Sequence, residues 1–175
     1  MKKVVLLFVS LLFVSTTLIG QTKAEKKALK AEAAQKEYTK MKTLIESGIY
    51  TFVAEWANSQ RGGRINMMGN PNYLKMDNEN VDAFLPYFGV VQAPSMSGNA
   101  GVEFSGPVTN YRVDYNDKKQ KVLIRFKAKN SSESFNLTLT VFQNGNASLN
   151  LSSSGRNSIS YDGKVKETEK TNEQE

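Results

Sequence analysis

Apolar and polar residues alternate along the C-terminal third of the chain, from Tyr111 to Gly163. A two-residue period puts one kind of side chain on each face of a β-strand, so it predicts strands with one buried face. The predicted strands are 111–115, 121–129, 134–143, 147–152 and 158–161. Their inward residues include Val122, Ile124, Phe126, Ala128, Phe135, Leu137, Leu139, Val141, Leu149 and Leu151. The links between them are short, so neighbouring strands must be antiparallel, and Asn144-Gly145 favours a type I′ hairpin.

The N-terminal half begins with a different pattern. Residues 23–47 are rich in Lys, Glu, Ala, Gln and Leu and contain neither Gly nor Pro, which predicts a helix of about six turns that ends at Ser47-Gly48. Its apolar residues cluster late, at spacings of three and four: Tyr38, Met41, Leu44 and Ile45. We therefore expect the second half of the helix to dock on the sheet and the first half to project or fray.

Two further strand regions follow the helix. Residues 49–58 alternate again, which places Tyr50, Phe52, Ala54 and Trp56 on one predicted face. Residues 64–68 and 73–76 are predicted to form a hairpin around Gly69-Asn70-Pro71-Asn72, where Pro71 fits a turn position.

The middle of the chain, 78–106, is the least regular part. Several large apolar side chains gather around Pro86, and a Gly-, Ser- and Pro-rich segment, 93–101, then leads to a short strand at 102–104. Such a cluster indicates a core plug first and a ligand-gripping loop second, with 95–101 as a flap or a plain connection. If a ligand is bound, the candidate binding residues are Phe84, Tyr87, Phe88 and Trp56.

Composition excludes several kinds of chemistry. The 175 residues, enough for one domain, contain neither cysteine nor histidine, so a disulfide, a thiolate nucleophile, a cysteine or histidine metal site and an imidazole base are all ruled out. The net charge of +6 is mild and its basic residues are scattered, which argues against nucleic acid. We predict no cofactor and no metal site.

The first twenty residues have the pattern of a secretory signal peptide. Lys2 and Lys3 precede the apolar run Val4–Ile19, and cleavage is expected after Gly20 or after Ala24. A permanent membrane anchor is the weaker alternative, because the run is shorter than the roughly 20 residues that span a bilayer. Without a cysteine the chain cannot be a lipoprotein, so we expect a periplasmic or secreted protein. The expected organisation is leader 1–20, charged helical extension 21–37, β-rich domain 38–165 and disordered tail 166–175.

Several segments, in order, resemble one bacterial family. They are Leu85-Pro86-Tyr87-Phe88-Gly89, Val102 to Pro107, the strands through Phe126 and Val141, Asn144 to Ala147, and Asn157 to Gly163. Together they are similar to the secreted family called domain of unknown function 4251, over roughly Tyr38 to Val165. The resemblance implies an envelope location but no activity, substrate or functional residues. Val90 stands where we expect an arginine in similar sequences.

These patterns predict a mainly β fold with eight to ten short antiparallel strands, arranged as a closed barrel or a two-layered sheet, with one N-terminal helix against it. The favoured function is a non-enzymatic binding module for an apolar or glycan-type ligand. The alternative is a structural or interaction protein of the envelope whose partner is another envelope protein. We expect a monomer without stable membrane insertion once the leader is removed.

An enzyme is the least favoured function. Catalysis would depend on carboxylates, with tyrosines in support, and a pair of carboxylates converging in a cleft would favour it. The candidate side chains are Asp77, Glu79, Asp82, Glu103, Asp114, Tyr87 and Tyr161.

Overall fold

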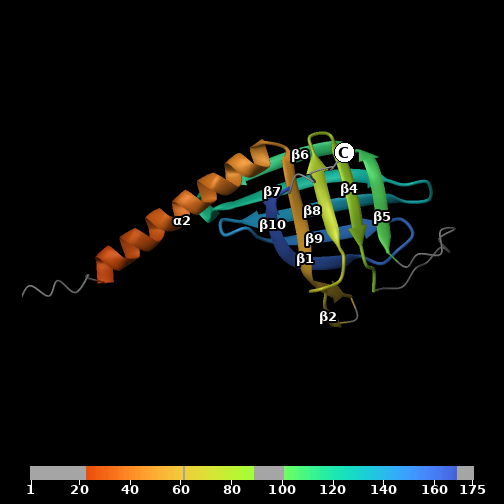
Figure 1. Ribbon diagram of the computed structural model, residues 1–175, viewed down its shortest axis with the longest axis horizontal. Helices are drawn as coiled ribbons and strands as arrows, with labels where there is room; N and C mark the ends of the chain where they lie inside the picture. The colour runs from red at the N-terminus through yellow and green to blue at the C-terminus, as the bar shows by residue number, and fades with distance from the viewer. Residues whose placement is uncertain (1–22, 61, 89–100, 169–175) are drawn as a thin grey trace, which may run out of the picture. The chain divides into compact units, whose positions relative to one another are not determined.

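The computed structural model describes residues 23–60, 62–88 and 101–168. Within these ranges one α-helix, one short 3-10 helix and ten strands are found (Figure 1). Their bounds are α2 Lys23–Glu46, β1 Ile49–Ser59, β2 Arg64–Asn66, β3 Tyr73–Asp77, β4 Asn80–Leu85, β5 Val102–Pro107, β6 Thr109–Asn116, η1 Asp117–Lys119, β7 Lys121–Lys129, β8 Ser134–Phe142, β9 Asn146–Ser153 and β10 Ile159–Glu167.

All ten strands belong to one antiparallel sheet. Its order is β5-β4-β3-β1-β10-β9-β8-β7-β6, and β2 pairs with β1 off this path. The sheet curls into a nearly closed barrel, in which β1, β3, β4 and β5 run across the strands β7, β8 and β9 (Figure 1). The two edge strands, β5 and β6, follow each other in the chain with only Val108 between them. The predicted mainly β fold is confirmed, and of its two forms the barrel is the closer description.

The predicted meander is confirmed over its central strands. Every residue that the alternation of β7, β8 and β9 assigned to the inward face is buried in the core. The hairpin between β8 and β9 also forms at Asn144-Gly145. Its turn is not type I′, however, because only Gly145 has a positive φ, of 80°, and its N–H donates to the Phe142 carbonyl at 3.0 Å. The loop therefore has three residues and ends on a left-handed glycine, the next most common hairpin geometry.

A β-bulge in β1 corrects the prediction for Trp56. Ala54 lies opposite Gly163 and Trp56 lies opposite Asp162, so Glu55 is an extra residue with no β10 residue directly opposite it. An extra residue reverses the alternation, and Ala57 is fully buried while Trp56 is only half-buried. The backbones are very close here, since a Cβ on Gly163 would overlap the Val53 carbonyl oxygen. Trp56 does not share the inward face of Tyr50, Phe52 and Ala54.

The predicted hairpin between β2 and β3 is wrong. Both strands pair with the same edge of β1, β3 along Ile49–Phe52 and β2 along Trp56–Asn58. At the break between them the buried Asn72 takes the place of a strand residue. Its amide oxygen accepts from the Ala54 N–H at 2.7 Å, and its amide nitrogen donates to the Ala54 carbonyl at 3.1 Å. Asn72 thus satisfies the Ala54 backbone groups that the break between β2 and β3 leaves unpaired.

Part of the middle of the chain is more regular than its sequence suggested. Residues 80–85 form β4, with Val81, Ala83 and Leu85 buried. The strand at 102–104 extends to Pro107 as β5. Val90 and most of the proposed flap, 95–100, lie outside the described residues.

The helix α2 belongs to two compact units, residues 1–33 and residues 34–175. In the first unit, its residues 23–33 are all exposed. In the second unit, Tyr38 and Ile45 are buried in the core, Met41 and Leu44 pack against it, and the Tyr38 hydroxyl donates to Asp117 at 2.9 Å. The predicted docking of the second half is therefore confirmed. Across the described ranges, no helix has both the length and the apolar character needed to cross a membrane.

Candidate functional site

The outward side chains of β3, β4 and β5 line a hollow of about 420 Å³. The strand register places them in two rows. Tyr73 lies opposite Phe84, which lies opposite Glu103. In the next row Asp82 lies between Ser105 and Lys75, and Lys75 does not itself line this hollow. Because directly opposite side chains in antiparallel strands are neighbours, the two rows bring aromatic, acidic and hydroxyl groups together on one surface.

The aromatic part of the hollow is the Tyr73–Phe84 pair. The ring centroids are 6.5 Å apart and the planes are tilted by 37°. Both side chains are half-buried, so part of each ring faces solvent. Lys75 Nζ lies 4.7 Å from the centroid of the Tyr73 ring. The pair offers an apolar surface beside a cation, which is a common arrangement around ligand rings.

The polar part of the hollow is formed by carboxylates. Glu103 is exposed and Asp82 is half-buried. Burial raises the pKa of Tyr73, and the negative charge of Asp82 raises it further. The Tyr73 hydroxyl therefore stays protonated well into alkaline solution, where it still acts as a hydrogen-bond donor beside the carboxylate acceptors.

Two more hollows continue this surface. The second, of about 550 Å³, shares Asp82 and Ser105 with the first and reaches Met76, Val81 and Gly106. The third, also about 550 Å³, shares Ile49 and Thr168 with the second. It is lined further by Thr39, Lys40, Thr43, Leu44, Ser47 and Glu167. Since each hollow shares residues with the next, the three form one succession along the surface of residues 34–168.

The structure does not bring the four predicted binding residues together. Phe84 lies in the first hollow. Tyr87 is buried elsewhere, Phe88 is exposed, and Trp56 stacks under the Arg64 guanidinium at 4.4 Å. The sequence prediction missed Tyr73 and Ser105. A partial signal for this surface was present, because the alternation of residues 80–85 indicates that Asp82 and Phe84 face outward together.

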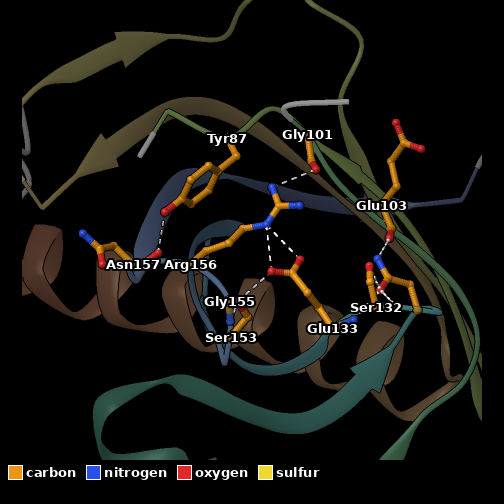
Figure 2. Close-up of polar contacts among 10 residues, drawn as sticks. Tyr87, Gly101, Glu103, Ser132, Glu133, Ser153, Gly155, Arg156 and Asn157 are labelled. Carbon is orange, nitrogen blue, oxygen red and sulfur yellow. Dashed lines mark hydrogen bonds and ion pairs between the residues drawn. The ribbon is translucent and has the colours of Figure 1, made fainter. Parts of the chain in front are cut away.

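Tyr87 belongs to a buried polar cluster centred on Arg156 (Figure 2). The side chain of Arg156 is 3% exposed and that of Glu133 is 10% exposed. Arg156 Nε donates to the two Glu133 carboxylate oxygens at 2.8 and 3.2 Å, and Nη1 donates to the Gly101 carbonyl at 2.9 Å. The guanidinium lies 5.2 Å from the Tyr87 ring centroid. The cluster joins the segment after β4, the residue before β5, the β7–β8 turn and the β9–β10 connection.

The hydroxyl groups of this region are also occupied. The Tyr87 hydroxyl donates to the Asn157 carbonyl at 2.9 Å, and the Tyr161 hydroxyl donates to the Pro86 carbonyl at 2.9 Å. Burial raises the pKa of Tyr161 strongly, and it raises the pKa of Tyr87 against the opposing effect of the Arg156 charge. Tyr87 is thus a structural residue that ties the 85–88 segment to the barrel.

The candidate catalytic carboxylates are divided among several places. Asp82 and Glu103 line the first hollow, and Asp77 lines the second with Asp82. Asp114 lies on the other edge strand, β6, and forms an ion pair with Arg125 of β7 at 2.6 Å. Among the described residues, no group of three or more acidic side chains is close enough to hold a metal ion.

Comparison with known proteins identifies the family. The domain of unknown function called DUF4251 matches residues 32–165. Among solved structures, the chain is similar to a DUF4251 family protein from Bacteroides eggerthii, with a TM-score of 0.61 and 16% sequence identity. That similarity covers 78% of this chain and 91% of the other. No curated protein matches. The segments from Leu85 to Gly163 that resembled this family were therefore correctly assigned, and the chain belongs to the DUF4251 family.

Proposed function

We propose that this protein is a non-enzymatic glycan-binding module, and that the hollow on β3, β4 and β5 is its binding site. The observation that carries the proposal is the row Tyr73–Phe84–Glu103 beside the row Lys75–Asp82–Ser105. A sugar ring has an apolar face and a rim of hydroxyl groups. The tilted aromatic pair suits the face, and the carboxylate and hydroxyl groups suit the rim.

The dimensions of the surface support an extended ligand. Each of the three hollows, at about 420 to 550 Å³, falls within the range of small-molecule sites. Their shared residues allow one chain of sugar units to contact more than one hollow. A compact apolar ligand fits this surface less well, because Asp82, Glu103 and Lys75 would lose water without gaining a partner.

We also propose that the protein acts outside the cytoplasm. The support is the basic start and apolar run of Met1–Gly20, the pattern of an export signal. An exported protein meets surface polysaccharides and peptidoglycan, which are glycans of the kind that this hollow would bind.

Calorimetric titration with soluble probes tests the proposal. The probes are cellopentaose, chitopentaose, maltopentaose and soluble peptidoglycan fragments, added to the chain without residues 1–20. We expect one class to bind, and the Tyr73→Ala and Phe84→Ala variants to bind it at least about tenfold more weakly, since each removes one aromatic contact. Phe142→Ala is the matched control, because Phe142 is exposed on β8 and lines none of the three hollows. Failure of every probe to bind, or an equal loss in the control, would contradict the proposal.

The mixtures from this titration also distinguish binding from catalysis. Asp82 and Glu103 line one hollow, which is the arrangement that would favour an enzyme. We expect the bound oligosaccharide to be recovered intact after prolonged incubation, as measured by mass spectrometry. Cleaved products that disappear in the Asp82→Asn or Glu103→Gln variant would show an enzyme instead.

A further inference from the structure

The strand β6 has a free edge. It is the last strand of the sheet, and β7 is its only pairing partner among the described residues. Seven of its eight residues are exposed, and the eighth, Val113, is half-buried. The inward tyrosines Tyr111 and Tyr115 are 36% and 38% exposed. A strand of this length with unpaired backbone groups is a template for a further strand.

The sequence of β6 is self-complementary around Val113. The residues from 110 to 116 read Asn-Tyr-Arg-Val-Asp-Tyr-Asn. Moving outward from Val113 in either direction gives a charged residue, a tyrosine and an asparagine, but the charge is positive at Arg112 and negative at Asp114. Two such strands, paired antiparallel about a two-fold axis at Val113, would place each Arg112 opposite Asp114 of the other copy.

The charges within one chain also favour such a partner. Arg112 lies directly opposite Arg125 on β7, and like charges in that position are unfavourable. Arg125 Nη1 binds Asp114 Oδ2 at 2.6 Å, whereas Arg112 makes no ion pair among the described residues. The Asp114 side chain is 62% exposed despite this bond, so it can accept a second cation. A second copy would bring its Asp114 to Arg112 and relieve the repulsion.

We propose that β6 pairs with β6 of a second copy of this chain, antiparallel and centred on Val113, to form a two-fold symmetric dimer. The contact is isologous: both copies present the same strand, so each contact between two different residues occurs twice in the dimer. The register shift between Thr109 and Arg112 and the positive φ of Asn110, 56°, limit the pairing to about Tyr111–Tyr115. An interface this short forms a weak dimer. The proposal replaces the monomer expected from the sequence and does not depend on the glycan site.

Disulfide trapping tests the register. The chain has no cysteine, so a single substitution gives one thiol per copy. On the two-fold axis residue 113 faces itself, with Cα atoms about 4.5 to 5.5 Å apart, which a disulfide can bridge. We expect Val113→Cys to give a covalent dimer on mild oxidation, seen by non-reducing electrophoresis. Ser105→Cys, an exposed position on the other edge strand, is the control and should stay monomeric.

Charge reversal tests the pairing in solution by sedimentation equilibrium, at concentrations up to about 1 mM, where weak complexes are populated. Arg112→Asp and Asp114→Arg each put like charges opposite one another twice per dimer, so we expect each to weaken association about tenfold or more. The double variant restores both opposite-charge pairs and should restore the dimer. The proposal would be overturned if the wild-type chain stays monomeric and the Val113→Cys variant traps no more dimer than the Ser105→Cys control. Dimerisation that the Arg112→Asp and Asp114→Arg substitutions leave unchanged would overturn it as well, because another surface would then be responsible.

Discussion

Replacing Arg156 with methionine is expected to destabilise the barrel severely. The substitution keeps most of the side-chain volume but removes the hydrogen bonds to the two Glu133 carboxylate oxygens and to the Gly101 carbonyl. With its side chain 10% exposed, Glu133 would be left as a buried carboxylate without its cation. Breaking a buried pair in this way costs about 3 to 5 kcal/mol, a large part of the free energy of unfolding of a typical domain.

A second substitution, at Glu133, tests the cause of this destabilisation. If Arg156→Met is destabilising because the buried Glu133 carboxylate has lost its cation, then removing that carboxylate as well should recover stability. We expect the double variant with Glu133→Leu to be within about 1 to 2 kcal/mol of the wild type, because buried ion pairs are often no more stabilising than apolar replacements of similar size. The changes in the free energy of unfolding that the two single substitutions cause should therefore not add up, as is usual for residues in contact.

Urea unfolding measures these free energies, with the fluorescence of Trp56 as the signal, since it is the single tryptophan. Lys164→Met is the matched control. Its ion pair with Glu55, at 3.0 Å, has side chains 60% and 37% exposed, so its loss should cost less than about 1 kcal/mol. The reasoning is refuted if Arg156→Met costs no more than the control, or if the double variant is as unstable as the sum of the single ones.

Three further predictions concern the barrel itself. Gly163→Ala should cost at least about 2 kcal/mol in urea unfolding, because the new methyl group would meet backbone atoms of β1, whereas Gly63→Ala would meet only the Ser59 hydroxyl and should cost less. Asn72→Ala should cost about 2 to 3 kcal/mol and speed hydrogen exchange at the Ala54 amide, which loses its acceptor; unchanged exchange would contradict this. Burial and then Asp117 raise the pKa of Tyr38 to about 12, above its usual 10. Its protonated form therefore stabilises the fold fully below pH 10, and this contribution is lost as the pH rises from 10 to 12. Tyr38→Phe should lose less stability over that interval, measured by urea unfolding at each pH, and an equal loss would refute the assignment.

The sequence alone was sufficient where one face of a strand is buried and the pairing is local. The alternation in β7 and β8 correctly predicted the inward residues, because a strand with one buried face must keep its apolar residues two apart. The helix bounds were predicted within one residue for a similar reason, since Gly48, which has a φ of 72°, ends the helix locally. The absence of cysteine and histidine excluded whole classes of chemistry without any structure.

Tertiary structure decided the features that depend on distant partners. The bulge at Glu55 turned Trp56 away from the core, and no local pattern marks it, because it is set by how β1 fits against β10. Asn72 was read as a turn residue, yet its amide pairs with a backbone 18 positions away. Arg156 and Glu133 are 23 residues apart, and the pairing of β8 with β9 brings them together. The Gly101 carbonyl and the Tyr87 ring, which contact Arg156 in this buried cluster, come from a distant part of the chain.

The candidate site shows the same division. The sequence singled out Phe84, but it could not show that Tyr73 and Glu103 lie on either side of it, because this depends on the register of three strands. Register is fixed by the packing of the whole sheet, and a shift of one residue would have turned every side chain of the site to the other face. The sequence thus determined which residues each strand can offer to its two faces. The folded barrel determined which of them meet.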